Sequence, residues 1–178
     1  MRYLLIGCLV FFNAGCSVTV KQPALHDFGL SAPATTGQGK ASISVVAPTW
    51  LWDNRIRYRL LYASPSQVRF YGLDRWIAAP PELFEQLLIS SGKTRDYVLL
   101  VRLQDFEQQF DAADRARVVL RFSVDAYAAD NKQKAITREF YLQQPTQSPD
   151  AAGAISGFSD LALKATQSIQ DWLIKHPG

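Results

Sequence analysis

The chain has 178 residues, 48% of them hydrophobic and 20% charged, and a formal net charge of +3 at pH 7. This length and composition suit one domain with an apolar core. The lysines and arginines are scattered and form no basic stripe, which argues against a nucleic acid partner.

The first residues have the features of a secretory signal, with a basic residue, an apolar run at 3–12 and small residues after it. That run is about half of the ~20 residues that a membrane-spanning helix needs. The Ala-Gly-Cys sequence at 14–16 resembles the lipobox of bacterial lipoproteins, although Asn13 stands where the lipobox usually has Leu. We therefore predict cleavage between Gly15 and Cys16 and acylation of Cys16.

Removal of a signal peptide at 1–15 would also remove Cys8, the only other cysteine. With Cys16 acylated, the mature chain would keep no thiol for a disulfide, a nucleophile or a metal site. The alternative is a plain cleavage site with a free Cys16 thiol, which would be unusual in an oxidising periplasm. The acyl lipid is the only attached group that we expect, and no cofactor is predicted.

Residues 16–40 are rich in Ser, Thr, Pro and Gly and are predicted to form a flexible tether. Such a linker would span roughly 25–30 Å. A more apolar stretch at 26–30 interrupts it, and a short strand there would shorten the tether. A single folded domain is predicted at 41–178.

Three short strands and a helix are predicted in the first half of the domain. A β-rich run at 41–48 stops at a proline. Residues 56–62 alternate between apolar or aromatic side chains and arginines, which predicts a half-buried strand. A Ser-Pro-Ser turn at 64–66 would join it to a strand at 67–73. The helix at 79–92 starts with prolines and has an apolar stripe at helical spacing.

Three long strands follow at 96–110, 116–129 and 134–144, joined by short polar links that suit antiparallel hairpins. Clean alternation in the last two is typical of antiparallel strands with one solvated face. An amphipathic helix at 151–176 ends at a proline. The order β-β-β-α-β-β-β-α predicts an α+β fold, with a mixed, mostly antiparallel sheet and both helices on one face.

The sequence has no pattern typical of a catalytic or metal site. His26 and His176 lie far from any candidate nucleophile or ligand cluster, so both are expected to be solvated. Asp111 and Asp114 lie in a hairpin link, where Asp is an ordinary turn residue. The nucleophile-elbow, zinc-protease and phosphate-loop motifs are absent from the sequence. We therefore predict no catalytic residue, no metal ligand and a protein that is not an enzyme.

Aromatic residues are concentrated between 50 and 76, where seven fall within 27 positions. Burial in the core is the plain explanation for most of them. Alternation cannot hide all of them on one face, however, and exposed aromatics are favoured anchors at interfaces. Two tryptophans beside Pro48 precede the first clean strand and are the best candidates for exposure. The predicted partner-binding residues are Trp50, Trp52, Tyr58, Tyr71 and Trp76.

The same stretch resembles a known family, the ABC-type transport auxiliary lipoproteins, which include the lipoprotein component of the paraquat-inducible MCE system. The family pattern has Ala-Pro after the first strand, Tyr in the next strand, Tyr followed by Arg-Trp, and a proline-led helix with Leu-Leu. The matching residues here are Ala47-Pro48, Tyr58, Tyr71, Arg75-Trp76, Pro80 and Leu87-Leu88. The order of strands and helices also agrees, so the resemblance covers most of 41–175.

The resemblance implies an outer-membrane lipoprotein that faces the periplasm and works with an MCE-domain protein and an inner-membrane ABC transporter. Such systems move lipids or other hydrophobic molecules across the envelope, and the family brings no catalytic residues. Ser17 lacks the Asp that usually retains lipoproteins at the inner membrane, which favours the outer membrane. Two alternatives stay open: a module that holds a lipid between sheet and helices, and a lipoprotein hydrolase. The sequence leaves open the cargo and whether the protein is a homo-oligomer.

Overall fold

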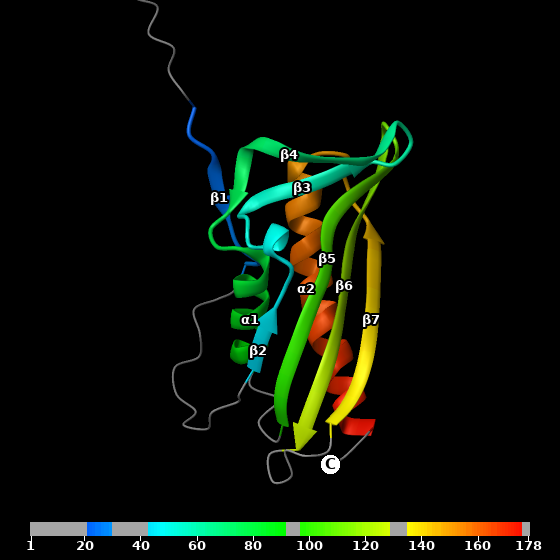
Figure 1. Ribbon diagram of the computed structural model, residues 1–178. Helices are drawn as coiled ribbons and strands as arrows, with labels where there is room; N and C mark the ends of the chain where they lie inside the picture. The colour runs from blue at the N-terminus through cyan, green and yellow to red at the C-terminus, as the bar shows by residue number, and fades with distance from the viewer. Residues whose placement is uncertain (1–20, 30–42, 92–96, 129–134, 176–178) are drawn as a thin grey trace, which may run out of the picture.

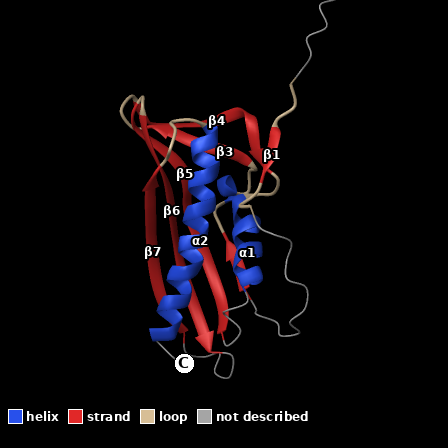
Figure 2. Cartoon of the chain, turned by 180° about the vertical axis from the view of Figure 1, so that it is seen from behind, coloured by secondary structure: helices blue, strands red, loops and turns tan. Residues whose placement is uncertain are grey.

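The structure is a computed structural model that describes residues 21–29, 43–91, 97–128 and 135–175. Within these residues, seven strands form one mixed sheet, and two helices pack against the same face of it (Figures 1 and 2). The predicted α+β fold with both helices on one face is confirmed. The elements are β1 (Ala24–His26), β2 (Ile43–Val46), the 3-10 turn η1 (Thr49–Leu51), β3 (Arg55–Leu60), β4 (Ser64–Trp76), α1 (Pro80–Ser91), β5 (Tyr97–Ala112), β6 (Arg115–Ala128), β7 (Ala135–Pro145) and α2 (Ala151–Lys175).

Long antiparallel pairs make the body of the sheet, and shorter pairs extend it on one side. β6 lies between β5 and β7 and is antiparallel to both. The opposite edge of β5 carries two parallel strands in succession, with β2 beside 99–102 and β3 beside 108–110. β4 forms an antiparallel hairpin with β3, and β1 pairs in parallel with the end of β4. The sheet therefore continues past η1 into a section made of β3, β4 and β1.

The core lies between the sheet and the helices and is rich in aromatic rings. Phe106 of β5 stacks on Phe158 of α2 with 3.9 Å between ring centroids, and Trp76 packs edge-on against both at 5.9 Å. Aromatic contacts of this geometry each contribute about 0.5–1.5 kcal/mol beyond the buried area. A second aromatic group lies between α1, the middle of the sheet and α2, and consists of Phe84, Phe122, Phe140 and Trp172.

α2 begins at a capping residue and approaches the sheet through glycines. Asp150 accepts a hydrogen bond from Gly153 N at 2.9 Å, which satisfies one of the free N–H groups of the first turn. A Cβ at Gly153 would lie 2.0 Å from the carbonyl oxygen of Ser148, so glycine is required there. A Cβ at Gly157 would lie 3.0 Å from a methyl group of Val118 on β6. These glycines let the first turns of α2 lie close to the strands.

Part of the predicted tether is folded onto the domain. β1 lies within the 16–40 segment, and Phe28 just after it is buried against Trp76 and Phe106, with ring centroids 5.5 and 6.0 Å apart. Burial of one large apolar side chain stabilises by about 1.5–3 kcal/mol, which explains why this segment leaves the solvent. The short strand that the sequence suggested at 26–30 lies at 24–26, so the segment free to act as a tether is shorter than 16–40.

His26 is also less solvated than predicted, because β1 brings it to the side chain of Asp74 on β4. The two side chains are hydrogen-bonded at 2.9 Å and both are partly buried. The predictions for Gly15, Cys16 and His176 lie outside the described residues. In the described part of the chain, no helix is long and apolar enough to cross a membrane.

The hairpin between β3 and β4 turns earlier than predicted. Its turn occupies 61–63 instead of 64–66, and Ala63 N donates to the carbonyl oxygen of Leu60 at 3.1 Å. Pro65 lies at the start of β4, where a strand tolerates the missing N–H. β4 consequently runs for 13 residues and is longer than the predicted strand at 67–73.

Candidate docking site on the open face of the sheet

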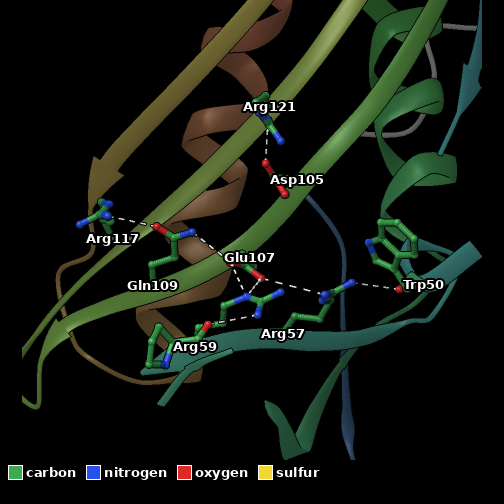
Figure 3. Close-up of polar contacts among 9 residues, drawn as sticks. Trp50, Arg57, Arg59, Asp105, Glu107, Gln109, Arg117 and Arg121 are labelled. Atoms are coloured by element: carbon green, nitrogen blue, oxygen red, sulfur yellow. Dashed lines mark hydrogen bonds and ion pairs between the residues drawn. The ribbon is translucent and has the colours of Figure 1, made fainter. Parts of the chain in front are cut away.

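The face of the sheet that the helices leave open carries a ladder of ion pairs, whose central part is drawn in Figure 3. Alternation along β5 and β6 directs every second side chain away from the core. At these positions, acidic side chains lie beside arginines of neighbouring strands, so most of the charge is neutralised within the face. The pairs are Arg102–Asp125 at 2.6 Å, Arg121–Asp105 at 2.7 Å, Arg59–Glu107 at 2.8 Å and Arg117–Asp111.

Glu107 is the centre of the most buried part of this ladder. Its carboxylate accepts hydrogen bonds from Arg59 Nε at 2.8 and 2.9 Å and from Gln109 Nε2 at 3.0 Å. Arg57 Nη2 lies 4.0 Å from the same carboxylate, and Arg57 Nη1 donates to the carbonyl oxygen of Trp50 at 3.1 Å. Figure 3 shows these side chains converging from β3, β5 and η1.

Arg57 is buried without a full set of partners. Its side chain is only 8% exposed, and its Nε has no hydrogen-bond partner. Burial lowers the pKa of Arg57, and the charge of Glu107 opposes that shift. The buried charge of the Arg57 guanidinium is therefore stabilised by the carboxylate of Glu107 instead of by water.

Two cavities of about 340 and 320 Å³ flank Trp50 on this open face. The first is bordered by the Arg59–Glu107 pair, and the second is bordered by three aromatic rings. Both are lined by Trp50, Arg57 and Val68. The first adds Leu51, Arg59, Gln104, Asp105, Phe106 and Glu107, and the second adds Thr49, Trp52, Asp53, Arg55 and Phe70.

Local structure explains why two tryptophans point outward here. η1 is a single turn after Pro48, closed by Leu51 N donating to the carbonyl oxygen of Pro48 at 2.9 Å. Leu51 is fully buried and anchors the turn, which leaves Trp50 61% exposed and Trp52 46% exposed on either side. The indole of Trp52 donates to the carbonyl oxygen of Ala47 at 3.2 Å. The predicted exposure of both tryptophans is confirmed.

Tyr58 and Tyr71 lie on the helix side of the sheet and are half-buried. Their rings pack with centroids 4.7 Å apart, and Tyr71 donates from its hydroxyl to the side chain of the buried Gln108 at 2.6 Å. Gln108 in turn donates to the carbonyl oxygen of Asp150 at 3.3 Å. Burial raises the pKa of Tyr71. These contacts tie the β3–β4 hairpin to the start of α2, which is a packing role.

Trp76 does not belong to a surface. It is 1% exposed and lies in the aromatic core, so its prediction as a partner-binding residue is wrong. The physical reason is the irregular pairing of β3 and β4 between Arg55 and Arg57, which shifts the alternation of β4 before Trp76. The structure therefore brings Trp50 and Trp52 together and separates them from Tyr58, Tyr71 and Trp76.

Sequence reasoning missed Arg57 and Glu107. Alternation in 56–62 predicts a solvated arginine face, whereas η1 covers Arg57 and lines the cavities beside it. The sequence did contain a signal. Arg57 and Arg59 lie two residues apart in β3, and Asp105 and Glu107 have the same spacing in β5. Such matched spacing predicts a cross-strand charge ladder.

The described side chains at this site are of the kinds that bind partners non-covalently. In the part of the chain that the structure describes, no group of three or more His, Cys, Asp or Glu side chains is placed to hold a metal ion. The site offers two exposed indoles, the Arg55 guanidinium 3.8 Å above the ring of Phe70, and two open cavities between them. Aromatic and arginine side chains are the residue types enriched at protein interfaces.

No family model and no curated protein matches the chain. Among solved structures, the chain is similar to the crystal structure of protein XCC0632 from Xanthomonas campestris, described as DUF330, with 16% identity and a TM-score of 0.63. That match covers 73% of this chain and 80% of the other. The chain is also similar to a crystal structure described as an uncharacterized protein, with 14% identity, a TM-score of 0.66 and coverage of 85% and 99%. At these identities, the likeness shows a shared fold alone.

Proposed function

We propose that this protein is a lipid-anchored outer-membrane lipoprotein that faces the periplasm and serves as the auxiliary component of an MCE/ABC-type transport system. In this role it docks an MCE-domain protein that works with an inner-membrane ABC transporter to move lipids or other hydrophobic molecules. It acts by binding and catalyses no reaction. The lipobox-like sequence at 14–16 and the ordered motifs from Ala47 to Leu88 support the family resemblance.

The observation that carries the docking role is the exposure of Trp50 and Trp52 beside two open cavities. Tryptophans that a partner buries on binding are among the residues that contribute most to the binding free energy of protein interfaces. The neighbouring charges pair with one another, so a partner gains little from net charge on this face. Apolar side chains of a partner would fill the cavities and cover both indoles. The arginines at the rim of the cavities would orient the partner on this face.

A lipid held between the sheet and the helices is the less favoured function. That space contains the Phe106–Phe158 stack and the ring of Trp76. The two cavities flanking Trp50 lie on the opposite, open face of the sheet. A binding role through surface docking therefore fits the described side chains better than an internal lipid site.

The test is photo-crosslinking of the full-length chain in intact cells. A photoreactive phenylalanine analogue replaces Trp50 or Trp52, and the captured protein is identified by mass spectrometry. Leu163 on α2 is the matched control, because it is 53% exposed but lies on a helix away from the cavities. We expect capture of an MCE-domain protein from both tryptophan positions and none from Leu163.

A quantitative form of the test uses alanine variants and the purified partner. Trp50→Ala and Trp52→Ala should each weaken binding by ~2 kcal/mol or more, which is about 30-fold, while Leu163→Ala leaves it unchanged. Equal capture from all three positions, or capture of no transport component from the tryptophan positions, would contradict the proposed function.

A further inference from the structure

Three exposed apolar side chains lie where β1 meets the end of β4. Leu25 is opposite Arg75 in the parallel register of β1 and β4, and Leu73 and Ile77 stand two residues before and after Arg75. Ile77 N donates to the carbonyl oxygen of His26 at 2.8 Å, so Ile77 continues the pairing. Leu25, Leu73 and Ile77, which we call the β1 patch, are each about half exposed or more.

Arg75 lies in the middle of the β1 patch. Its side chain is only partly exposed, and its Nε is buried without a hydrogen-bond partner. A long arginine side chain that keeps its stem on apolar surface and its charge at the edge is typical of a boundary between apolar and polar surroundings. Apolar side chains around a single arginine thus have the composition of an interfacial surface.

The position of Cys16 in the sequence indicates what this patch faces. Eight residue steps separate Cys16 from Ala24 at the start of β1, and a fully extended chain of that length spans at most about 29 Å. A flexible chain of that length averages about 15 Å. β5, with 16 residues, is about 53 Å long. A lipid on Cys16 would therefore keep the β1 patch near the bilayer, whereas the far end of the long strands can stand well away from it.

We propose that the β1 patch rests on the phospholipid leaflet in which Cys16 is anchored and that this contact orients the domain. The inference rests on the proposed lipid anchor. Leu25, Leu73 and Ile77 enter the boundary between headgroups and acyl chains, and Arg75 keeps its guanidinium at the level of the phosphates. The acyl anchor limits the distance from the membrane, and the patch selects which side of the domain faces it.

The chain offers a matched pair of isoleucines for the test. Ile77 is 61% exposed in the patch, and Ile174 is 77% exposed in the last turn of α2. β1 and the C-terminal end of α2 lie toward opposite ends of the molecule (Figures 1 and 2). Ile77→Cys and Ile174→Cys each place one free thiol in the acylated mature chain, and a nitroxide label is attached to that thiol.

The labelled full-length lipoprotein is reconstituted in vesicles of phosphatidylethanolamine and phosphatidylglycerol, and collisions of the nitroxide with oxygen and with a water-soluble nickel complex are measured. We expect the ratio of oxygen to nickel collisions to be several-fold higher at position 77 than at position 174. Equal ratios at the two positions would overturn the inference. Loss of both kinds of collision at position 77 would also overturn it, because that result means burial by protein.

Mass spectrometry of the same reconstituted protein separates the two proposals. Acylated Cys16 together with a water-exposed label at position 77 would overturn only the membrane-contact inference. An unmodified Cys16 would overturn the lipid anchor and, with it, the argument from chain length. Cell crosslinking at Trp50 and Trp52 tests partner docking independently of either result.

Discussion

Replacement of Glu107 by glutamine should destabilise the domain strongly, although the substitution keeps the size of the side chain. In the native protein, Glu107 is buried, receives both hydrogen bonds from Arg59 Nε and lies 4.0 Å from Arg57. Glutamine keeps one acceptor but removes the negative charge. Two arginines would then share a buried site with no carboxylate, and Arg57 already has an unpartnered Nε.

The expected loss follows from the burial of the two arginines. Removing one partner of a buried ion pair costs about 3–5 kcal/mol, because the remaining charge stays desolvated. The side chain of Arg57 is only 8% exposed, although it lines the same cavity of about 340 Å³ as Arg59, whose side chain is 25% exposed. Since water can reach Arg59, we expect the lower end of the range, about 3 kcal/mol.

Urea unfolding followed by tryptophan fluorescence measures this loss as a fall in the midpoint of about 1–3 M. Asp105→Asn is the matched control, because Asp105 lies two residues away on the same strand and its pair with Arg121 is half exposed on both sides. Exposed pairs contribute about 0–1 kcal/mol, so the control should stay near wild type. If Glu107→Gln costs no more than Asp105→Asn, the charge of Arg57 does not depend on Glu107 for its stabilisation.

Substitutions at Trp76, Asp150 and Gly153 test the fold, with Trp50→Ala as a control for the first. Trp76→Ala should cost about 3–5 kcal/mol in denaturant unfolding, because it empties the aromatic core, whereas Trp50→Ala should change stability by less than about 0.5 kcal/mol. Asp150→Ala should cost about 1 kcal/mol near neutral pH through the lost helix cap. The Ser148 hydroxyl and the Gly153 N–H lower the pKa of Asp150. The loss in free energy of unfolding caused by Asp150→Ala should therefore be complete at pH values above the ordinary pKa of 3.8, and it should vanish as the pH falls through the lowered pKa. Gly153→Ala should lower the Tm despite the better helix propensity of alanine, because its Cβ would lie 2.0 Å from Ser148 O; an unchanged or raised Tm would contradict the close approach.

The long strands and both helices could be predicted because their signals are local. Alternation in β6 and β7 and the apolar stripes of α1 and α2 appear within each segment, and the observed bounds lie within a few residues of the predictions. The local signal for β1 was weak and suggested a short strand at 26–30, because β1 is three residues long and lies in a stretch rich in turn-forming residues. Its stability comes from Phe28 packing against Trp76, which is remote in sequence.

The candidate site was partly predictable for a related reason. Trp50 and Trp52 stand beside a proline and outside any alternating run, so their exposure follows from local sequence. Trp76 was misassigned because alternation is a reliable guide only while the register is regular. Phe70 pairs with Arg57 on the open face, and regular alternation would place Trp76 on the same face. The register shift between Phe70 and Arg75 reverses the alternation, so the Trp76 side chain points into the core. Register shifts depend on the neighbouring strand and leave no mark in the strand's own pattern.

The two proposals place docking and membrane contact on neighbouring parts of one surface. Trp76 N donates to the carbonyl oxygen of Asn54 at 2.8 Å, so the loop that follows Trp52 borders the end of β4 and the β1 patch. A partner bound at the tryptophans would stand close to the leaflet that holds the lipid anchor. Such proximity is what a transport system for hydrophobic molecules requires, because its cargo must cross from the partner to the bilayer through as little water as the geometry allows.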